Sequence, residues 1–222
     1  PTELARWRAY ADRLAELTRH RPALSAAPMI DFVGPLFALA QRRGASGAAA
    51  EENRAALLVL TLYANRRSLA VLLPQARGWP EPRPLSLTLN SRTDTPLHFL
   101  TSAAIAAEAG GPLADTVGLY KEASDAQGGS GFSFNDLAAD RAGTRFGLLL
   151  VRSAGRMQQL LAGSLAERDL MPEVEDLPEG LSAPDFARRF DRVGTPEYER
   201  LIREIDARID RCRVYAAFGS RS

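Results

Sequence analysis

The chain of 222 residues contains one cysteine, Cys212, one lysine, Lys121, and only two histidines, His20 and His98. A single cysteine excludes an intrachain disulfide and any zinc site built from several cysteines. The chain has no H-E-x-x-H pattern and no second histidine near His98, which argues against zinc held by paired histidines. The sequence therefore predicts no cofactor, and a divalent metal would need His98 together with carboxylates.

Excess charge and long apolar runs are also missing. With 28 basic and 27 acidic residues the formal net charge is +1, so no overall field attracts nucleic acid or an anionic membrane, and nucleic acid is not an expected partner. The most apolar stretch, residues 55–73, is interrupted by Asn65, Arg66 and Arg67, which excludes a transmembrane helix there. Apolar content of 45% is that of an ordinary globular protein.

Hydrophobic residues recur at helical spacing along most of the chain, and start and stop signals divide it into helices. We expect helices over residues 4–17, 30–42 and 48–72, with a bend or break at 63–67, and further helices beginning at Thr95, Pro112 and Ser133. The Ser133 helix should run to about Arg152, another should pass through Met157 to Glu167, and a last pair should cover 184–190 and 196–212.

Five prolines between Pro74 and Pro96 predict an extended connection, and R-P-L-S-L-T-L-N within it alternates apolar and polar residues. That segment carries either one short edge strand or an extended stretch packed on the helices. The expected fold class is all-α, an irregular multi-helix bundle with this proline-rich connection and at most a small strand or hairpin insertion. We expect a single helical domain, 1–222, with its motif-bearing core at 94–152.

Most residues able to do chemistry lie between Asp94 and Gly147. His98 falls in the first turn of its helix, where the positive end of the helix dipole favours the neutral imidazole, a possible base or metal ligand. Asp94, four residues earlier, is placed to orient it. Alternatively, Asp94 caps the backbone amides and His98 is a hydrogen-bonded packing residue.

Glu122 and Asp125 are three residues apart on the helix expected after Pro112, and are therefore neighbours on one face. Lys121 stands beside them. In a chain that otherwise uses arginine, this lysine indicates either a compact ammonium that can lose its proton or a solvated residue without a role.

The segment S-F-N-D predicts a capping box, with Ser133 as N-cap and Asp136 at the third helical position. Asp140 lies one turn further on, and Gly143 and Gly147 extend the same stripe as a track without side chains. Such a track admits either a tightly packed helix or an extended substrate. Asp140 needs a partner, and the candidates are Arg141, Arg145 and His98.

The glycine-rich turn at 128–132 has backbone amides that could bind an anion at the start of the Ser133 helix. No G-K-[ST] sequence follows, which argues against a phosphate-binding loop. The serines there lack a G-x-S-x-G context, and a serine triad is not expected.

These residues resemble two related sets of bacterial cell-envelope proteins: a family of small envelope lipoproteins and the VanZ-like membrane family. Both have an aspartate four residues before a His-Phe pair, a glutamate after the next helix, and a Ser-aromatic-x-Asp-Leu run ending in glycine. The matching positions here are Asp94, His98, Phe99, Glu122, Ser133, Phe134, Asp136, Leu137, Asp140 and Gly143. The match covers about a quarter of the chain. Unlike the VanZ-like proteins, these helices are too polar to span a bilayer.

The resemblance implies a periplasmic or outer-envelope protein with an envelope polymer or envelope protein as partner. On the first hypothesis it is a hydrolase or lyase acting on a polymer such as peptidoglycan, with Glu122 as general acid or base, His98 assisting and Asp140 balancing charge. Supporting positions are Asp94, Lys121, Asp125, Ser133 and Asp136. On the second it is a non-catalytic adaptor or ligand-binding module, whose polar residues form a buried network fixing three helices. A third holds that His98, Glu122 and Asp136 or Asp140 bind a divalent metal.

Overall fold

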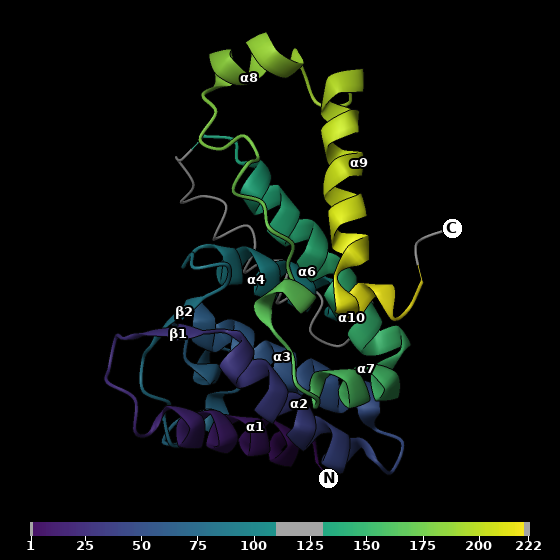
Figure 1. Cartoon of the computed structure of the whole chain (residues 1–222). Coiled ribbons are helices and arrows are strands. Elements are labelled where there is room, and N and C mark those ends of the chain that lie inside the picture. Colours follow the sequence, from purple (N-terminus) through teal and green to yellow (C-terminus); the bar gives the residue numbers. More distant parts are fainter. Residues whose placement is uncertain (1, 110–130, 220–222) are drawn as a thin grey trace.

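The computed structural model describes residues 2–109 and 131–219. Helices dominate this part of the chain, and the coarse prediction of a helical protein is confirmed (Figure 1). The helices are α1 (Glu3–Thr18), α2 (Ile30–Gly44), α3 (Ala49–Ala64), α4 (Thr95–Glu108), α6 (Phe134–Arg152), α7 (Ala154–Leu161), α8 (Ala183–Phe190), α9 (Pro196–Arg211) and α10 (Arg213–Ala216). Short 3-10 helices cover Leu69–Val71, Pro74–Ala76 and Glu167–Asp169. The helix expected at Pro112 lies outside the described residues.

α3 is the central helix. It ends at Ala64, within the segment 63–67 where the sequence predicts a bend or break, and it does not continue to residue 72. The amide of Arg66 donates to Tyr63 O at 3.0 Å and the amide of Arg67 to Leu62 O at 2.8 Å, the pattern of a Schellman helix end. Arg66 holds the left-handed position with φ of +54°. Glycine usually holds that position, so the sequence indicated a bend or break here but not the exact end of the helix.

A two-stranded parallel sheet joins β1 (Ala26–Pro28) to β2 (Ser86–Thr88), with Ala27 opposite Leu87. β2 falls in the alternating segment for which an edge strand was one of two predictions. β1 was not predicted, because three residues that include a proline carry no strand signal of their own. Its strand geometry comes from a partner about sixty residues away in the sequence, so the description as all-α is corrected to predominantly α.

Glu52 is a buried carboxylate that the sequence did not single out. Glu52 on α3 has no exposed surface. It accepts hydrogen bonds from Tyr10 Oη at 2.6 Å, from Arg6 Nε at 3.0 Å and from Arg43 Nε at 2.9 Å. These donors lie on α1 and α2, so one ionic network ties three helices together.

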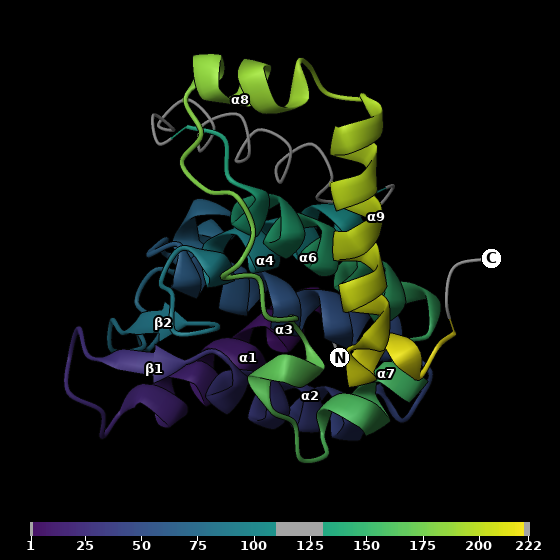
Figure 2. The same ribbon diagram turned by 45° about the horizontal axis from the view of Figure 1, so that its top comes forward.

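α7 ends at Leu161, six residues earlier than predicted, and α8 and α9 form an arm that extends beyond the rest of the bundle (Figure 2). An aromatic cluster holds the arm against the start of α6: Phe132, Phe134, Phe186, Phe190 and Tyr198. Ion pairs from Arg141 to Asp206 and from Arg145 to Asp210 join α6 to α9 further along. Because each pair repeats after four residues, the two helices meet along one face.

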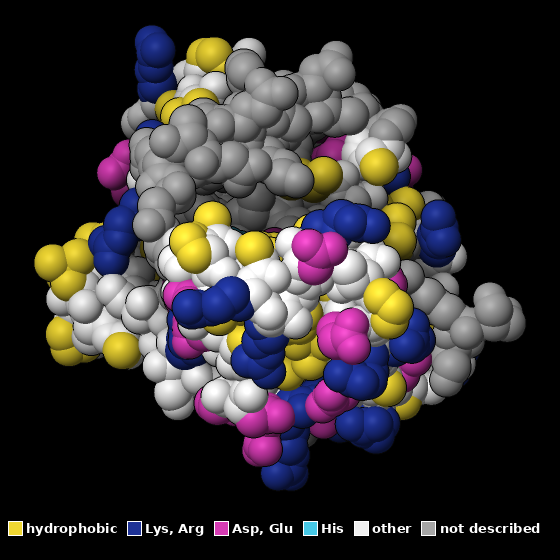
Figure 3. All heavy atoms as spheres, turned by 90° about the horizontal axis from the view of Figure 1, so that it is seen from above, with side chains coloured by type: hydrophobic (Ala, Val, Ile, Leu, Met, Phe, Trp, Pro, Cys, Tyr) yellow, Lys and Arg dark blue, Asp and Glu magenta, His cyan; other side chains and the backbone are white. Residues whose placement is uncertain are grey.

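Basic and acidic side chains are interspersed over the face of the molecule seen in Figure 3, as the near-zero net charge leads one to expect. Of the helices in residues 2–109 and 131–219, none combines the length and apolar composition needed to cross a bilayer.

Candidate functional site

His98 lies in the first turn of α4, where the sequence placed it. Asp94 is the N-cap residue, as one of its two predicted alternatives has it, and its Oδ1 accepts the amide of Thr95 at 2.8 Å. Pro96 follows in the first turn, where its missing amide proton costs nothing. The amide of His98 donates to Asp94 O at 3.2 Å within the helix backbone.

α6 begins as predicted, with Ser133 as its N-cap. Ser133 Oγ accepts the amide of Asp136 at 3.1 Å. The reciprocal bond of a capping box, donated by the Ser133 amide to the Asp136 carboxylate, is not among the hydrogen bonds of residues 131–219. The Asp136 carboxylate instead faces α4. The Ser133 cap therefore fixes the rotation of α6 that brings Asp136 and Asp140 to this side.

Gly143 and Gly147 let α4 and α6 touch backbone to backbone. A Cβ atom on Gly143 would overlap the carbonyl of Phe99, and one on Gly147 would overlap the carbonyl of Ala103. The glycine track is thus filled by a packed helix, and the alternative of an extended substrate lying along it is wrong. Because α4 covers Gly143, this glycine does not form the bottom of a concave surface.

The imidazole of His98 lies between two carboxylates of α6. Its Nδ1 is 3.4 Å from Asp140 Oδ1, and its Nε2 is 3.7 Å from Asp136 Oδ2. Ser102, one turn along α4 from His98, donates its hydroxyl to Asp140 Oδ1 at 2.8 Å. The side chains of His98, Asp140 and Asp136 are 40%, 41% and 25% exposed. We call His98, Asp136 and Asp140 the His98 centre.

The charges in this centre perturb one another. The contact with Asp140 raises the pKa of His98 above its ordinary value, against the opposing effect of burial, and Asp136 and Asp94 add to the rise. Burial raises the pKa of Asp136, while the positive charge of His98 counteracts part of that change. His98 therefore carries a proton to higher pH than a free histidine.

Asp94 does not orient His98 as expected, because its carboxylate is engaged elsewhere. Arg92 Nε lies 3.0 Å from Asp94 Oδ1 and Arg92 Nη2 lies 2.6 Å from Asp94 Oδ2. This pairing lowers the pKa of Asp94. Arg92 also donates to Glu179 at 2.9 Å, and Glu179 accepts Asn135 Nδ2 at 3.3 Å. Asp94 thus acts on His98 through its charge and through its backbone carbonyl.

Sequence reasoning missed Arg92 and Glu179, which link the start of α4 to the start of α6. The sequence R-T-D, with an arginine two residues before the capping aspartate, was the available signal for Arg92. Glu179 stands 87 residues further along the chain, and nothing local points to their pairing.

Lys121, Glu122 and Asp125, with most of the glycine-rich turn, lie outside the described residues. Of the three candidate partners of Asp140, His98 is the one in contact. Arg141 and Arg145 pair with Asp206 and Asp210 on α9 instead.

In the described ranges, no group of three or more histidine, cysteine, aspartate or glutamate side chains is arranged to hold a metal ion. Cys212 is buried, and its Sγ donates to Arg208 O at 3.6 Å. Burial raises the pKa of this thiol to about 11, so it stays protonated at neutral pH.

Comparison of the chain with protein-family models, with curated proteins and with solved structures finds no match.

Proposed function

We propose that the His98 centre is an acid–base site of a hydrolase or lyase that acts on a bacterial envelope polymer such as peptidoglycan. The observation that carries the proposal is the position of the His98 imidazole, held between two carboxylates of another helix while 40% of its side chain stays exposed. A titrating group with perturbed pKa and access to solvent is what proton transfer to a substrate requires.

Helix packing does not need this centre. The contact between α4 and α6 is already made by Gly143 and Gly147 against backbone carbonyls. A polar network whose purpose is packing is expected to be buried, as the Glu52 carboxylate and its hydrogen bond from Tyr10 are. The His98 centre is partly exposed, which disfavours the version of the adaptor hypothesis that rests on a buried network.

Each residue has a distinct role in the proposed reaction. His98, protonated with the support of Asp140, acts as general acid toward a leaving-group oxygen. Ser102 fixes Asp140 through its hydroxyl, and Asp136, 3.7 Å from Nε2 on the other side of the ring, adds negative charge that favours the protonated imidazole. Glu122 remains the proposed second acid–base carboxyl group. Ser102 donates to Asp140 and not to His98, so the described residues do not form a serine–histidine nucleophile pair, and direct attack by water is favoured.

The envelope compartment and the polymer substrate rest on the resemblance of Asp94, His98, Asp136 and Asp140 to positions of envelope families. Three of these four positions, separated by up to 42 residues, meet in the His98 centre. This proximity supports a shared site, because residues that match a motif but have no common role need not lie together in the fold.

The test is digestion of purified sacculi followed by separation of the released muropeptides. Wild type should change the profile, and His98→Gln, Asp140→Asn and Glu122→Gln should reduce the change by about a hundredfold, the usual contribution of a general acid or base. His20→Gln is the matched control, because His20 is exposed at the end of α1. An unchanged profile with wild type would eliminate the proposed reaction.

The adaptor hypothesis predicts a different pattern for the same variants. If His98→Gln and Asp140→Asn lower the melting temperature as strongly as a core substitution and no polymer is cleaved, the centre is structural. A catalytic centre loses little stability, or gains some, on such changes. Elemental analysis of untagged protein addresses the metal hypothesis, which needs stoichiometric metal that His98→Gln removes.

A further inference from the structure

A hollow lies between α1, the C-terminal half of α3 and the segment 68–84, on elements other than those that carry the His98 centre. Its volume is about 330 Å³, at the small end of the range of about 300–1,000 Å³ for ligand pockets. Most of its wall is apolar, including Leu14, Val59, Leu69 and Ala76. The proline-rich connection forms one side of the hollow.

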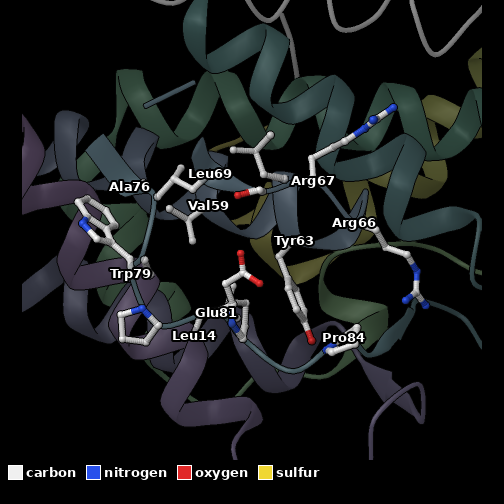
Figure 4. Close-up of a pocket in the computed structure, with 15 residues that line it drawn as sticks. Leu14, Val59, Tyr63, Arg66, Arg67, Leu69, Ala76, Trp79, Glu81 and Pro84 are labelled. Atoms are coloured by element: carbon white, nitrogen blue, oxygen red, sulfur yellow. The ribbon is translucent and has the colours of Figure 1, made fainter. Parts of the chain in front are cut away.

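Two aromatic rings stand in the wall on either side of one carboxylate (Figure 4). Tyr63 donates its hydroxyl to Arg83 O at 2.7 Å, so its polar end is satisfied and its ring faces the hollow. The Glu81 carboxylate points into the hollow between Tyr63 and Trp79. Glu81 forms no ion pair in the part of the chain that the structure describes.

The arginines around the hollow do not neutralise Glu81. The guanidinium groups of Arg66 and Arg67 point away from the hollow in Figure 4. Arg66 donates to Ser86 Oγ at 3.0 Å. Arg8 stacks on Trp79 at 5.1 Å from the ring centroid and is paired with Asp12 at 2.9 Å. The group aimed into the hollow is therefore negative.

We propose that this hollow binds a small organic cation, an ammonium group attached to a compact apolar body. The apolar walls would take the body, and Glu81 would supply the counter-charge. The faces of Trp79 and Tyr63 add cation–π attraction, which is strongest for tryptophan. A neutral apolar molecule would leave the Glu81 carboxylate facing an apolar ligand, and an organic anion would be repelled by it.

The experiment compares three probes of the same shape: 2-phenylethylamine, 2-phenylethanol and 3-phenylpropanoate. Binding is followed by the indole ¹H–¹⁵N signals of the two tryptophans. Trp79 lines the hollow, whereas Trp7 is buried elsewhere and serves as an internal reference. The amine should shift the Trp79 signal and leave Trp7 unchanged, and it should bind more tightly than the alcohol, with the carboxylate weakest.

Glu81→Gln should weaken binding of the amine by about fivefold, the size of an exposed ion pair, and should leave binding of the alcohol unchanged. Glu81 is exposed in a loop, so the variant should keep its fold. Glu51→Gln, an exposed acid on α3 outside the hollow, is the matched control and should bind like wild type. Equal affinity for all three probes, tightest binding of the carboxylate, no binding at millimolar concentration, or a Glu81→Gln variant that binds the amine normally would each overturn the proposal.

Discussion

Gly143→Ala should destabilise the protein by about 2 kcal/mol, although alanine is the better helix former. The new Cβ would overlap the carbonyl of Phe99, whose oxygen and carbon are backbone atoms in α4. Backbone atoms cannot rotate aside, so α4 and α6 must move apart, and overpacking of this kind costs up to about 3 kcal/mol. The better helix propensity of alanine returns about 1 kcal/mol.

Urea denaturation gives the free energy of unfolding, and thermal melting should fall by about 4–8 °C for a chain of this length. Gly155→Ala is the matched control. A Cβ on Gly155, in α7, meets nothing within 4 Å. The control should therefore be neutral or stabilised by up to about 1 kcal/mol. Equal shifts of the same sign in the two variants would refute the close contact between α4 and α6.

The Gly143→Ala substitution should also change the geometry of the His98 centre. Moving α4 away from α6 lengthens the distance from His98 Nδ1 to Asp140, now 3.4 Å. That contact is the largest cause of the raised pKa of His98. An NMR titration of the imidazole in Gly143→Ala should show the pKa falling toward its ordinary value of about 6.5. A pKa that stays at the wild-type value in a destabilised variant would mean that the contact does not set it.

Three other results are expected. Glu52→Gln should lower the free energy of unfolding by about 3 kcal/mol, because it leaves Arg43 without its buried counter-charge; urea denaturation showing a loss below 1 kcal/mol would contradict the network. The raised pKa of His98 adds stability that is fully present below about pH 6.5 and is lost as the pH rises through the folded-state pKa. The stability gap between wild type and His98→Gln should therefore narrow as the pH is raised, and a gap independent of pH would argue against the charged contact. Arg92→Met should let the pKa of Asp94 rise toward about 3.9, measured by carboxyl NMR, and no change would show that Arg92 is not its main partner.

Local signals predicted the fold well wherever the helix ends are determined by their own residues. Ser133 caps α6 through its hydroxyl and Pro196 opens α9, and both boundaries follow from sequence alone. Prediction failed where the structure departs from local preference. A bend or break was predicted at 63–67, where α3 ends, but the left-handed conformation of Arg66, which is usual for glycine, had no local signal. β1 is a strand only because β2 lies beside it.

The candidate site was likewise predicted only where a local pattern marks its residues. The four-residue spacing of Asp136 and Asp140 placed them on one helix face, and His98 was among the partners weighed for Asp140. Glu52 was missed because E-E-N at the start of an alanine-rich helix is typical of a solvated turn. Only the arrival of Arg6 from α1 and Arg43 from α2 makes its burial possible, and pairings 46 and 9 residues apart leave no local pattern.

The Glu52 network and the His98 centre differ in their physical properties. Glu52 has no exposed surface, and burial acts to raise its pKa, but hydrogen bonds from Tyr10, Arg43 and Arg6 outweigh that effect and lower it. Such a carboxylate stays ionised and cannot exchange protons at neutral pH. The His98 centre combines the opposite properties: Asp136 and His98 both have raised pKa values, and both keep contact with solvent. This contrast supports the proposal that the Glu52 network stabilises the fold, whereas the His98 centre takes part in acid–base chemistry.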